Sequence, residues 1–324
     1  MMRRYLVRRL VYLIVVLFGV SVLAFGLGRL APGDPARDVL ARTTGRQPTQ
    51  AEVAVERHRL GLDRSLVGQY VSWLSDALRG DLGTSYTTGE PVARAVGETL
   101  PLTLELAGTA FLLSLLLGVP LGVVAAARSW TWVDHLVRVV IMAGASIPAF
   151  WLGYLLILLF SVTLHVLPSF GTGGLTHLVL PAATLALFEV AMLARLTRGA
   201  LLETFGEPYM QTAWAKGIRE RTVLLRHGLR AALNPLVTWQ GLTLGYLFGY
   251  SVVVETVFAW PGLGYSTVLA IQSRDYPFLQ AFVLLMGIVF VVLNLLVDLL
   301  YLWIDPRLRT TLGTGSVTRA GAGG

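Results

Sequence analysis

The sequence contains no cysteine and a single lysine, Lys216, beside 25 arginines. Without cysteine, the chain has no disulfides, no thiolate nucleophile and no zinc site built on thiolates. Charge is sparse as well, since 14% of the 324 residues are charged where about 25% is usual for a soluble domain. Hydrophobic residues make up 55% of the chain and form long uninterrupted runs. This composition indicates a protein whose solvent is the lipid bilayer.

Motifs for catalysis are missing too. A phosphate-binding loop ends in Gly-Lys-Ser or Gly-Lys-Thr, whereas Lys216 is followed by Gly217, so the chain cannot bind ATP in that way. The sequence has no His-Glu-x-x-His and no Gly-x-Ser-x-Gly, and none of its five histidines has a second histidine at ligand spacing. No catalytic pair for an intramembrane enzyme is visible. We therefore expect a non-enzymatic chain with no metal site.

Six apolar runs are long enough to span a membrane, since a helix needs about 20 mainly apolar residues to cross the hydrocarbon layer. They predict an all-α membrane protein with six spanning helices. Arginines precede the first run as in a signal peptide, but that run is long and has no evident small-residue cleavage site, which favours a retained helix. The predicted spans cover residues 10–27, 102–127, 136–164, 178–196, 236–257 and 278–303.

Arginine and lysine in the short connections set the orientation. They gather at the N-terminus, between the second and third runs, between the fourth and fifth, and after the sixth, while residues 165–177 contain neither. Both termini are therefore expected in the cytoplasm. The predicted division is an N-terminal spanning helix (1–30), an extracytoplasmic helical segment (31–100), a core of five spanning helices (101–308) with a cytoplasmic coupling loop (203–233), and a disordered tail (309–324).

Two helices are predicted within residues 31–100. Thr49 and Glu52 form a capping-box pattern that begins a helix, and Gly61 ends it. The second helix precedes Gly80 and carries an apolar stripe at helical spacing, which we expect to pack on the outer face of the membrane domain. That stripe consists of Leu66, Tyr70, Leu74, Ala77 and Leu78.

Polar and aromatic residues near the runs need an explanation, because charge is costly in the bilayer and usually faces a bundle interior or an aqueous path. Glu105 and Glu255 lie near run ends, so we expect solvated interfacial carboxylates there. Glu189 lies mid-run, where lining of a pathway and a hydrogen bond inside the bundle are equally open. Asn294 and Asp298 share a helix face and are expected to fasten helices together. The expected interfacial anchors are Trp130, Trp132, Trp260 and Trp303.

Glycines at four-residue spacing mark two further helix faces. Gly118 and Gly122 form one Gly-x-x-x-Gly step in the second run, and Gly241, Gly245 and Gly249 form two overlapping steps in the fifth. Such a face lets another helix approach closely or leaves room for a solute beside the backbone. The candidates for lining a pathway are Glu189, Gly241, Gly245 and Gly249.

The connection between the fourth and fifth runs is polar yet organised. Pro208 can begin a helix, and Gly217 stands where a left-handed glycine would end it. A second short helix is predicted over residues 219–233, ending before Pro235. Two short helices joined by a glycine suit docking on a partner, or an amphipathic loop resting on anionic lipid. The residues expected along one face of the first helix are Tyr209, Thr212, Ala213 and Lys216.

The same connection carries a motif. Thr-Ala-Trp-Ala-Lys-Gly at 212–217 is followed nine residues later by His-Gly-Leu-Arg at 227–230, with a proline at 235. This pattern resembles the cytoplasmic loop signature of the membrane-spanning permease subunits of ABC importers, in the branch for dipeptides, oligopeptides and nickel. The general signature has Glu-Ala-Ala, three residues and Gly, then Ile-x-Leu-Pro. Gln211 and Thr212 replace its Glu and first Ala, and His227 and Arg230 replace its Ile and Pro, as in that branch.

Further stretches resemble the same family along nearly the whole chain. They are residues 60–63, 80–85, 100–105, 146–151, 177–182, 255–264, 274–277 and 305–307. The resemblance implies a type I permease-like core in a bacterial inner membrane, forming half of a translocation pathway. It implies as partners a second homologous permease, two ATPase subunits that carry ATP and Mg, an extracytoplasmic solute-binding protein and membrane lipid. No cofactor in this chain and no nucleic-acid partner are implied.

On this view, the cytoplasmic loop is the coupling helix (209–217) that fits a groove on an ATPase. Ala213 and Gly217 would permit close docking, and Lys216 would contact the ATPase or complement the negative end of the helix. The residues implied in coupling are Tyr209, Thr212, Ala213, Ala215, Lys216, Gly217, His227 and Arg230.

Two alternatives concern cargo and class. Peptides are favoured over nickel as cargo, because nickel would need imidazole or carboxylate ligands and the sequence offers few: His165, His177 and Glu189. A stand-alone secondary transporter is the alternative class. Such a carrier usually shows inverted repeats or interrupted helices with coupling-ion ligands, and the sequence has no evident internal repeat.

Overall fold

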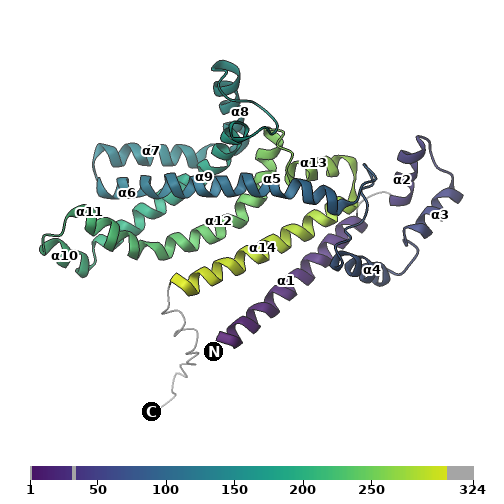
Figure 1. Cartoon of the computed structure of the whole chain (residues 1–324), viewed down its shortest axis with the longest axis horizontal. Helices are drawn as coiled ribbons and strands as arrows, with labels where there is room; N and C mark the ends of the chain where they lie inside the picture. The colour runs from purple at the N-terminus through teal and green to yellow at the C-terminus, as the bar shows by residue number, and fades with distance from the viewer. Residues whose placement is uncertain (1, 31–33, 305–324) are drawn as a thin grey trace, which may run out of the picture.

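The computed structural model describes residues 2–30 and 34–304, and this part of the chain is almost wholly helical (Figure 1). Within it, the only β-type pairing is an isolated antiparallel bridge between Thr84 and Pro91. The first elements are α1 (Met2–Leu30), α2 (Pro35–Thr44), α3 (Gln50–Arg59), α4 (Leu66–Leu78) and α5 (Val92–Leu113), which continues through a π-helical turn, η1 (Ser114–Gly118), into α6 (Val119–Ala127). Then come α7 (Trp132–Ser146), α8 (Ala149–Leu156), the π-helical η2 (Ile157–Thr163) and α9 (Leu175–Phe205). The last are α10 (Pro208–Ala215), α11 (Glu220–Thr222), the π-helical η3 (Val223–Gly228), α12 (Leu229–Val257), α13 (Leu263–Ser273) and α14 (Tyr276–Ile304).

Four helical stretches are long and apolar enough to cross a membrane: Val11–Arg29, Val92–Ala127, Leu175–Phe205 and Tyr276–Leu296. A fifth is present if α7 and α8 with η2 count as one bent span. The predicted run 236–257 lies within α12, of which Thr243–Val257 is a shorter apolar stretch. The all-α class is therefore confirmed, with four to five candidate spans among the described residues.

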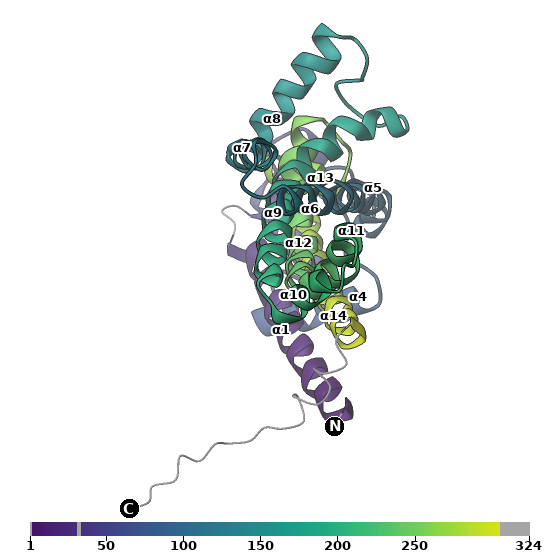
Figure 2. The same ribbon diagram turned by 90° about the vertical axis from the view of Figure 1, so that its left-hand side faces the viewer.

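α9 is the central helix of the bundle. It contacts α5, α6, α7, α8 and α12, and Leu180, Leu185 and Leu193 along it are almost fully buried. α12 packs against α5, α8, α9, α13 and α14. Figures 1 and 2 show these helices gathered together, with α1 and α14 side by side at one edge. The core therefore forms where several apolar helix faces meet around α9.

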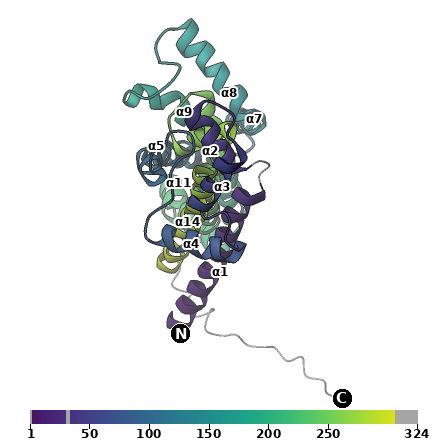
Figure 3. The same cartoon turned by 90° about the vertical axis from the view of Figure 1, so that its right-hand side faces the viewer.

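The two ends of the bundle carry different elements. α10 and α11 lie at one end in Figure 1, while α2, α3 and α4 lie at the other end, which faces the viewer in Figure 3. The connection between α9 and α12 is therefore far from residues 34–91. This separation is what a chain with one loop on each side of a membrane requires.

The predicted span 136–164 is not one straight helix. α7 and the helix formed by α8 and η2 meet at 106°. The bend falls at Ile147, whose backbone is extended (φ −82°, ψ 122°), just before Pro148. A proline disfavours helical backbone at the residue before it and offers no N–H to the helix, so the chain turns there.

The predicted helix stop before Pro235 is wrong. α12 begins at Leu229 and runs through Pro235 to Val257, so the predicted short helix 219–233 is instead α11, η3 and the first turn of α12. Proline removes one hydrogen bond from a helix, but a long helix packed on several neighbours keeps the rest of its hydrogen bonds and its buried contacts. Pro101 in α5 and Pro181 in α9 are accommodated in the same way.

Both predicted helices in the N-terminal segment are confirmed. The capping box of α3 is complete: the Thr49 N–H donates to Glu52 Oε2 at 2.8 Å, and the Glu52 N–H donates to Thr49 Oγ1 at 3.4 Å. Gly61 follows with a left-handed φ of 66°. α2, whose N-cap is Asp34, was not predicted.

The apolar stripe of α4 packs only in part on the membrane helices. Tyr70 contacts α1, whereas Leu66 and Leu78 are 65% and 81% exposed. The loop after α4 is fastened elsewhere, to the turn between α13 and α14, where the buried Asp275 accepts hydrogen bonds from the Ser85 hydroxyl and from the Tyr86 N–H (3.1 Å). The N-terminal segment is therefore attached to the bundle at two separate places.

Candidate functional site

The connection between α9 and α12 folds into a compact knob, residues 208–228. Pro208 opens α10, and Gly217 ends it with a left-handed φ of 72°. The Ile218 N–H donates to the Ala213 carbonyl at 3.3 Å and the Gly217 N–H to the Trp214 carbonyl at 2.9 Å, which is the Schellman arrangement of a glycine-terminated helix. The predicted start and end of this helix are therefore confirmed.

The knob has a small core of its own. Met210, Ala213 and Val223 are buried against Phe205 and Ile218, and the rings of Phe205 and Trp214 lie 5.8 Å apart at 65°. Ala213 is 8% exposed, so it packs inside the knob and cannot itself supply an open docking surface. Ala213 was expected along one face with Tyr209, Thr212 and Lys216, which are exposed, but its own side chain is buried against η3 and the end of α9.

The structure separates the other residues implied in coupling into two groups. Tyr209 is half exposed, and Thr212, Ala215, Lys216 and Gly217 are exposed on or just after α10. The partly exposed His227 and the exposed Arg230 lie on η3 and on the first turn of α12. α10 and η3 are in contact, so the two groups border one surface of the knob.

A buried ion pair lies where α7 begins beside α9. Arg198 donates to both oxygens of Asp134 at 2.7 and 2.8 Å, and the Trp130 N–H donates to the same carboxylate at 3.1 Å. Asp134 is fully buried, while the Arg198 side chain is 18% exposed. The sequence showed only a basic residue at position 198, because its partner lies 64 residues earlier. The pair fixes the corner between α6 and α7 against α9.

Gly118 and Gly122 serve close helix packing. A Cβ atom on Gly122 would lie 2.5 Å from the Ala194 carbonyl oxygen, and one on Gly118 would lie 3.0 Å from the Val190 carbonyl oxygen, both on α9. In the second glycine series, a Cβ on Gly245 would lie 3.0 Å from the Phe290 ring of α14, whereas Gly249 has nothing within 4 Å. Only part of that series is therefore in close contact with a helix of this chain.

Glu189 joins α9 to α12. Its Oε2 accepts hydrogen bonds from the Trp239 indole N–H at 3.2 Å and from the Thr243 hydroxyl at 3.0 Å, and Glu189 is 6% exposed. Nearby, the Gln240 amide of α12 donates to the Ser114 hydroxyl of η1 at 3.2 Å. Glu189 thus makes hydrogen bonds inside the bundle, which is one of the two roles that its mid-run position left open.

Glu255 is not an interfacial carboxylate, contrary to expectation. It is fully buried: the Thr103 hydroxyl donates to its Oε1 at 2.7 Å, and the Tyr265 N–H donates to its Oε2 at 2.8 Å. The Leu263 N–H donates in turn to Thr103 Oγ1 at 2.8 Å. Glu255 and Thr103 therefore cap the first turn of α13 and tie it to α12 and α5. The carboxyl group is buried because it serves the free N–H groups at the start of α13, and only the tertiary structure brings that helix end beside Glu255. Glu105, by contrast, is exposed.

Trp260 is also core, contrary to its expected role as an anchor. It is 2% exposed, and its indole N–H donates to the Leu102 carbonyl at 3.1 Å. Beside it, a Cβ atom on Gly262 would lie 2.5 Å from Glu255 Oε2 and 2.6 Å from Thr103 Oγ1, so glycine is needed for this approach. Trp130 and Trp132 are 80% and 74% exposed, which fits anchors.

Two remaining expectations concern the C-terminal helix and tail. Asn294 donates to the Phe290 carbonyl of its own helix at 2.8 Å, and among the described residues it makes no hydrogen bond to a second helix. The side chains of Asp298 and Trp303, residues 305–307 and the tail 309–324 lie outside the described residues.

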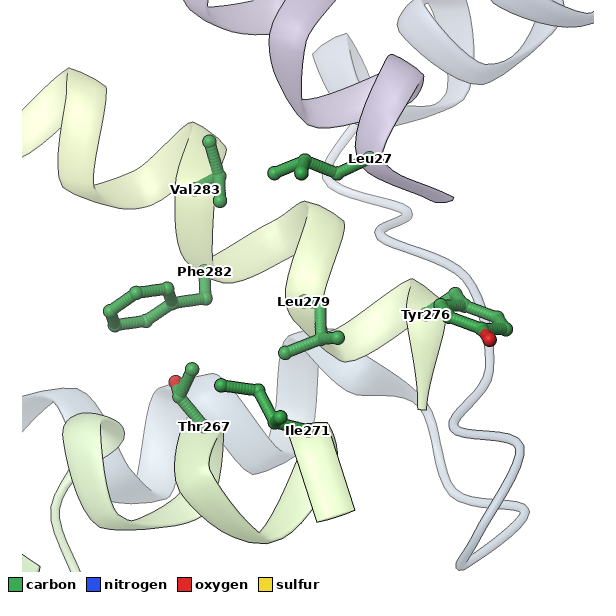
Figure 4. A pocket seen from close by; sticks show the side chains of 7 residues that line it. All are labelled: Leu27, Thr267, Ile271, Tyr276, Leu279, Phe282 and Val283. Atoms are coloured by element: carbon green, nitrogen blue, oxygen red, sulfur yellow. The ribbon is translucent and has the colours of Figure 1, made fainter. Parts of the chain in front are cut away.

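An apolar cavity of about 450 Å³ lies between α1, α13 and α14 (Figure 4). The only side-chain oxygens in its lining belong to Thr267 and Tyr276, and the Thr267 hydroxyl is engaged with the Leu263 carbonyl. A peptide has charged ends and polar amides that such a lining would leave unpaired. The cavity is therefore not a peptide site. Its lining residues are Leu27, Thr267, Ile271, Tyr276, Leu279, Phe282 and Val283.

Comparisons with known proteins agree along nearly the whole chain. Residues 118–310 match the family described as "Binding-protein-dependent transport system inner membrane component", and residues 2–107 match its N-terminal counterpart. The chain is 42% identical over 308 residues to the "Glutathione transport system permease protein GsiC" of Escherichia coli strain K12, covering 95% of this chain and 99% of that protein. It is also 42% identical to the "Probable D,D-dipeptide transport system permease protein DdpB" of the same strain, covering 91% and 94%.

The solved structures support the fold. The inward-facing MetNI methionine ABC transporter contains a chain with a TM-score of 0.55 and 21% identity, which covers 65% of this chain and 96% of that one. That identity is too low to carry function, but the arrangement of helices is shared. The chain therefore belongs to the binding-protein-dependent transport system inner membrane components: it is a multi-pass permease subunit of an ABC importer, and the ATPase is a separate partner chain.

Proposed function

We propose that this permease forms half of a pathway for di- and oligopeptides, driven by ATP hydrolysis on partner subunits. The cargo class is supported by the relatives, whose names specify glutathione and a D,D-dipeptide. The nickel alternative has less support, because the residues 2–30 and 34–304 include no group of three His, Asp or Glu side chains placed to hold a metal ion. Weak binding of peptides by polar but uncharged groups suits a subunit that must release its cargo.

The observation that carries the pathway proposal is the open face of α12. This helix packs on α5, α8, α9, α13 and α14, and its remaining face presents Tyr246, Gly249, Tyr250 and Val253 at helical spacing. Tyr246 and Tyr250 are 67% and 60% exposed. Tyr246 lies eleven residues before the end of α12, or about 16 Å at the rise of an α-helix, which is too deep for an interfacial anchor.

The outer face of α14 differs from this one. On α14 the exposed large side chains include Ile288, Phe290 and Leu296, which suit lipid. Hydroxyl groups at mid-membrane depth instead suit an aqueous path. In this proposal Tyr246, Tyr250 and the half-exposed Trp239 line the path with the glycines Gly241, Gly245 and Gly249, while Glu189 holds Trp239 in place from behind.

The orientation and partners complete the proposal. Six spans with both termini in the cytoplasm place the knob on the ATPase side and residues 34–91 outside, where a solute-binding protein delivers cargo. A second related permease supplies the other half of the path, and two ATPases supply the drive. Tyr209, Thr212 and Lys216, exposed on α10, face the ATPase groove, while the left-handed Gly217 lets the chain turn tightly beside it.

The cargo test is uptake by the complete transporter in proteoliposomes, purified with its second permease, ATPases and binding protein. Labelled glutathione or a dipeptide is expected to accumulate only when the ATPases have ATP. Accumulation of nickel in place of peptide would support the metal alternative. Peptide transport by this chain alone, without ATP, would support a secondary carrier instead.

The pathway test removes hydroxyl groups. Tyr246→Phe combined with Tyr250→Phe keeps both rings, and we expect slower peptide uptake with unchanged ATPase activity. Tyr154→Phe is the matched control, because Tyr154 is 57% exposed but belongs to α8 and not to α12. Equal uptake by the double variant, the control and the natural protein would contradict the proposal that α12 forms the polar wall of the path.

The coupling test uses two glycines with the same backbone. Gly217 and Gly45 have φ values of 72° and 65°, and a Cβ atom added to either would have no neighbour within 4 Å, so valine strains the backbone alike at both. Gly217→Val is expected to lose ATPase association and uptake while still inserting in the membrane. Gly45→Val, in the segment after α2, should keep both. Normal uptake by Gly217→Val would contradict the coupling role.

A further inference from the structure

α4 is unusually apolar for a helix outside the predicted spans. Its thirteen residues contain one charged side chain, Asp76, and the flanking charges Arg64 and Arg79 lie beyond its ends. Val67 and Val71 are 72% and 58% exposed, and Leu66 and Leu78 are more than half exposed as well. A helix surrounded by water would be expected to carry polar residues on such a face.

Another side of α4 packs on α1 through aromatic rings. Tyr70 lies edge-on to Phe18 and Phe25, with ring centroids 6.4 and 5.5 Å apart, and its hydroxyl is 2.8 Å from the Ser21 hydroxyl. Trp73 contacts Phe25 at 5.9 Å. These contacts fix the position of α4 along the axis of α1.

The position of these contacts on α1 sets the depth of α4. Phe18, Ser21 and Phe25 all lie within the candidate span Val11–Arg29. Ser21 is eight residues before Arg29, or about 12 Å along an α-helix. The Arg29 guanidinium folds back over the Phe25 ring at 5.4 Å, as a cation near the edge of the hydrocarbon does. The Tyr70 hydroxyl therefore reaches well below the membrane surface, and α4 must lie at that surface.

We propose that α4 lies in the plane of the membrane, in the leaflet where α1 ends, with its free apolar face in contact with lipid acyl chains. Val67, Val71 and Leu78 lie within about 40° of one another around the helix, so they form one face. Helices that lie at the interface bury such a face about 5–10 Å into the headgroup and acyl boundary. Tyr70 and Trp73 are the aromatic types that favour this depth.

The consequence is a second anchor for the extracytoplasmic segment. Residues 34–59 are attached to the bundle through α4 on α1, through the loop whose Ser85 and Tyr86 bind Asp275, and through Arg42 of α2, which donates to the Ser273 carbonyl. With α4 held by lipid, the charged helices α2 and α3 are carried above the membrane at a fixed height. This inference concerns the lipid and does not depend on the cargo.

The absence of cysteine makes the test direct, because a single introduced cysteine is the only site for a spin label in this chain. The partner subunits are prepared with their own cysteines replaced. Val67→Cys and Val71→Cys probe the free face of α4, and Val55→Cys on α3 is the matched control, since Val55 is 71% exposed. The complete transporter is placed in phospholipid nanodiscs, and accessibility to oxygen and to a water-soluble nickel chelate is measured for each label.

The proposal expects an oxygen-to-nickel accessibility ratio several-fold higher at positions 67 and 71 than at position 55. Equal ratios at the three positions would place α4 in water and overturn the proposal. Low accessibility to both reagents at 67 and 71 would overturn it in favour of a protein partner on this face. Each substitution replaces an exposed valine by a smaller residue, and retained uptake verifies that the labelled transporter is folded.

Discussion

Two carboxyl groups, Asp134 and Glu255, are fully buried at opposite ends of the bundle, yet they are satisfied in different ways. Asp134 faces a full positive charge, the Arg198 guanidinium, in a two-pronged contact. Glu255 faces only neutral donors, the Thr103 hydroxyl and the Tyr265 N–H. Each group fixes a helix corner: α7 against α9 in the first case, and α13 against α12 and α5 in the second.

A buried carboxyl group can therefore fix a helix corner either through an ion pair or through neutral hydrogen-bond donors. A buried ion pair is directional and strong but leaves a costly charge if one partner is lost. A carboxyl group that accepts helix-end donors needs close backbone approach, and Gly262 provides it. We therefore expect the junction near the knob to be sensitive to loss of charge, and the junction at α13 to be sensitive to added volume and to loss of an acceptor.

The largest effect is expected for Arg198→Ala. Removal of the guanidinium leaves the buried Asp134 without its hydrogen-bonded partner and with only the Arg138 guanidinium, 3.8 Å away, as a cation. The change should destabilise the transporter by about 3 kcal/mol. The loss is measured as a lower unfolding midpoint in detergent. Arg195→Ala on the same helix is the control, because Arg195 is exposed. Combining Arg198→Met with Asp134→Asn should recover part of the loss, and no recovery would mean that the charge is not the cause.

Glu255→Gln is expected to cost about 2 kcal/mol. The amide has one acceptor oxygen where two donors require one each, so either the Thr103 hydroxyl or the Tyr265 N–H loses its partner. This loss of stability is measured as a lower unfolding midpoint in detergent, and Glu105→Gln is the exposed control. A midpoint equal to that of the control would show that the junction at α13 does not depend on these hydrogen bonds.

Gly262→Ala tests the need for close approach at the same junction, with an expected cost of about 1–2 kcal/mol. A Cβ there would lie 2.5 Å from the Glu255 carboxyl group, so the added methyl group must displace it. Gly249→Ala adds the same methyl group where nothing lies within 4 Å. If both variants unfold at the same midpoint, the approach of Gly262 is not what closes the junction.

The smallest effect concerns a carboxylate on the surface of α3. The Arg46 guanidinium, together with the Thr49 N–H and hydroxyl, lowers the pKa of Glu52 from 4.5 to about 2. Because the folded pKa lies below the unfolded value, the contact stabilises the start of α3 above pH 4.5 and is lost as the pH falls toward 2.

The measurement is amide hydrogen exchange of residues 49–60, corrected for the intrinsic rate at each pH. Protection should fall between pH 4.5 and pH 2 in the natural chain. In Glu52→Gln, whose side chain does not titrate, it should be lower at pH 6 and change little with pH. A similar pH profile in both proteins would assign the change to another group.

Local patterns were read well from the sequence. The capping box of Thr49 and Glu52, the left-handed Gly217 and the start of α10 at Pro208 depend on residues only a few positions apart, and all three are present as predicted. The extended turn at Ile147 and Pro148 was missed although its cause is local, because continuous hydropathy over residues 136–164 hid the break.

The polar contacts inside the bundle could not be read in the same way. Glu255 looked interfacial because it lies near the end of an apolar run, and Trp260 looked like an anchor for the same reason. Their partners, Thr103 and the Leu102 carbonyl, lie more than 150 residues away. Position within a run gives depth along the membrane normal, but it does not say which neighbour lies beside a residue.

The sequence by itself determined that this protein spans a membrane, that it belongs to the permeases of ABC importers, and where the short helices α3 and α10 begin and end. Hydropathy, capping and glycine or proline effects act over one or two turns, so they are written locally. Only the tertiary structure decided which buried polar groups meet, that Ala213 lies inside the knob, and that α4 lies against α1 at the edge of the span. Those outcomes depend on helix packing between distant segments, because a buried donor or acceptor is stable only where another helix supplies its partner.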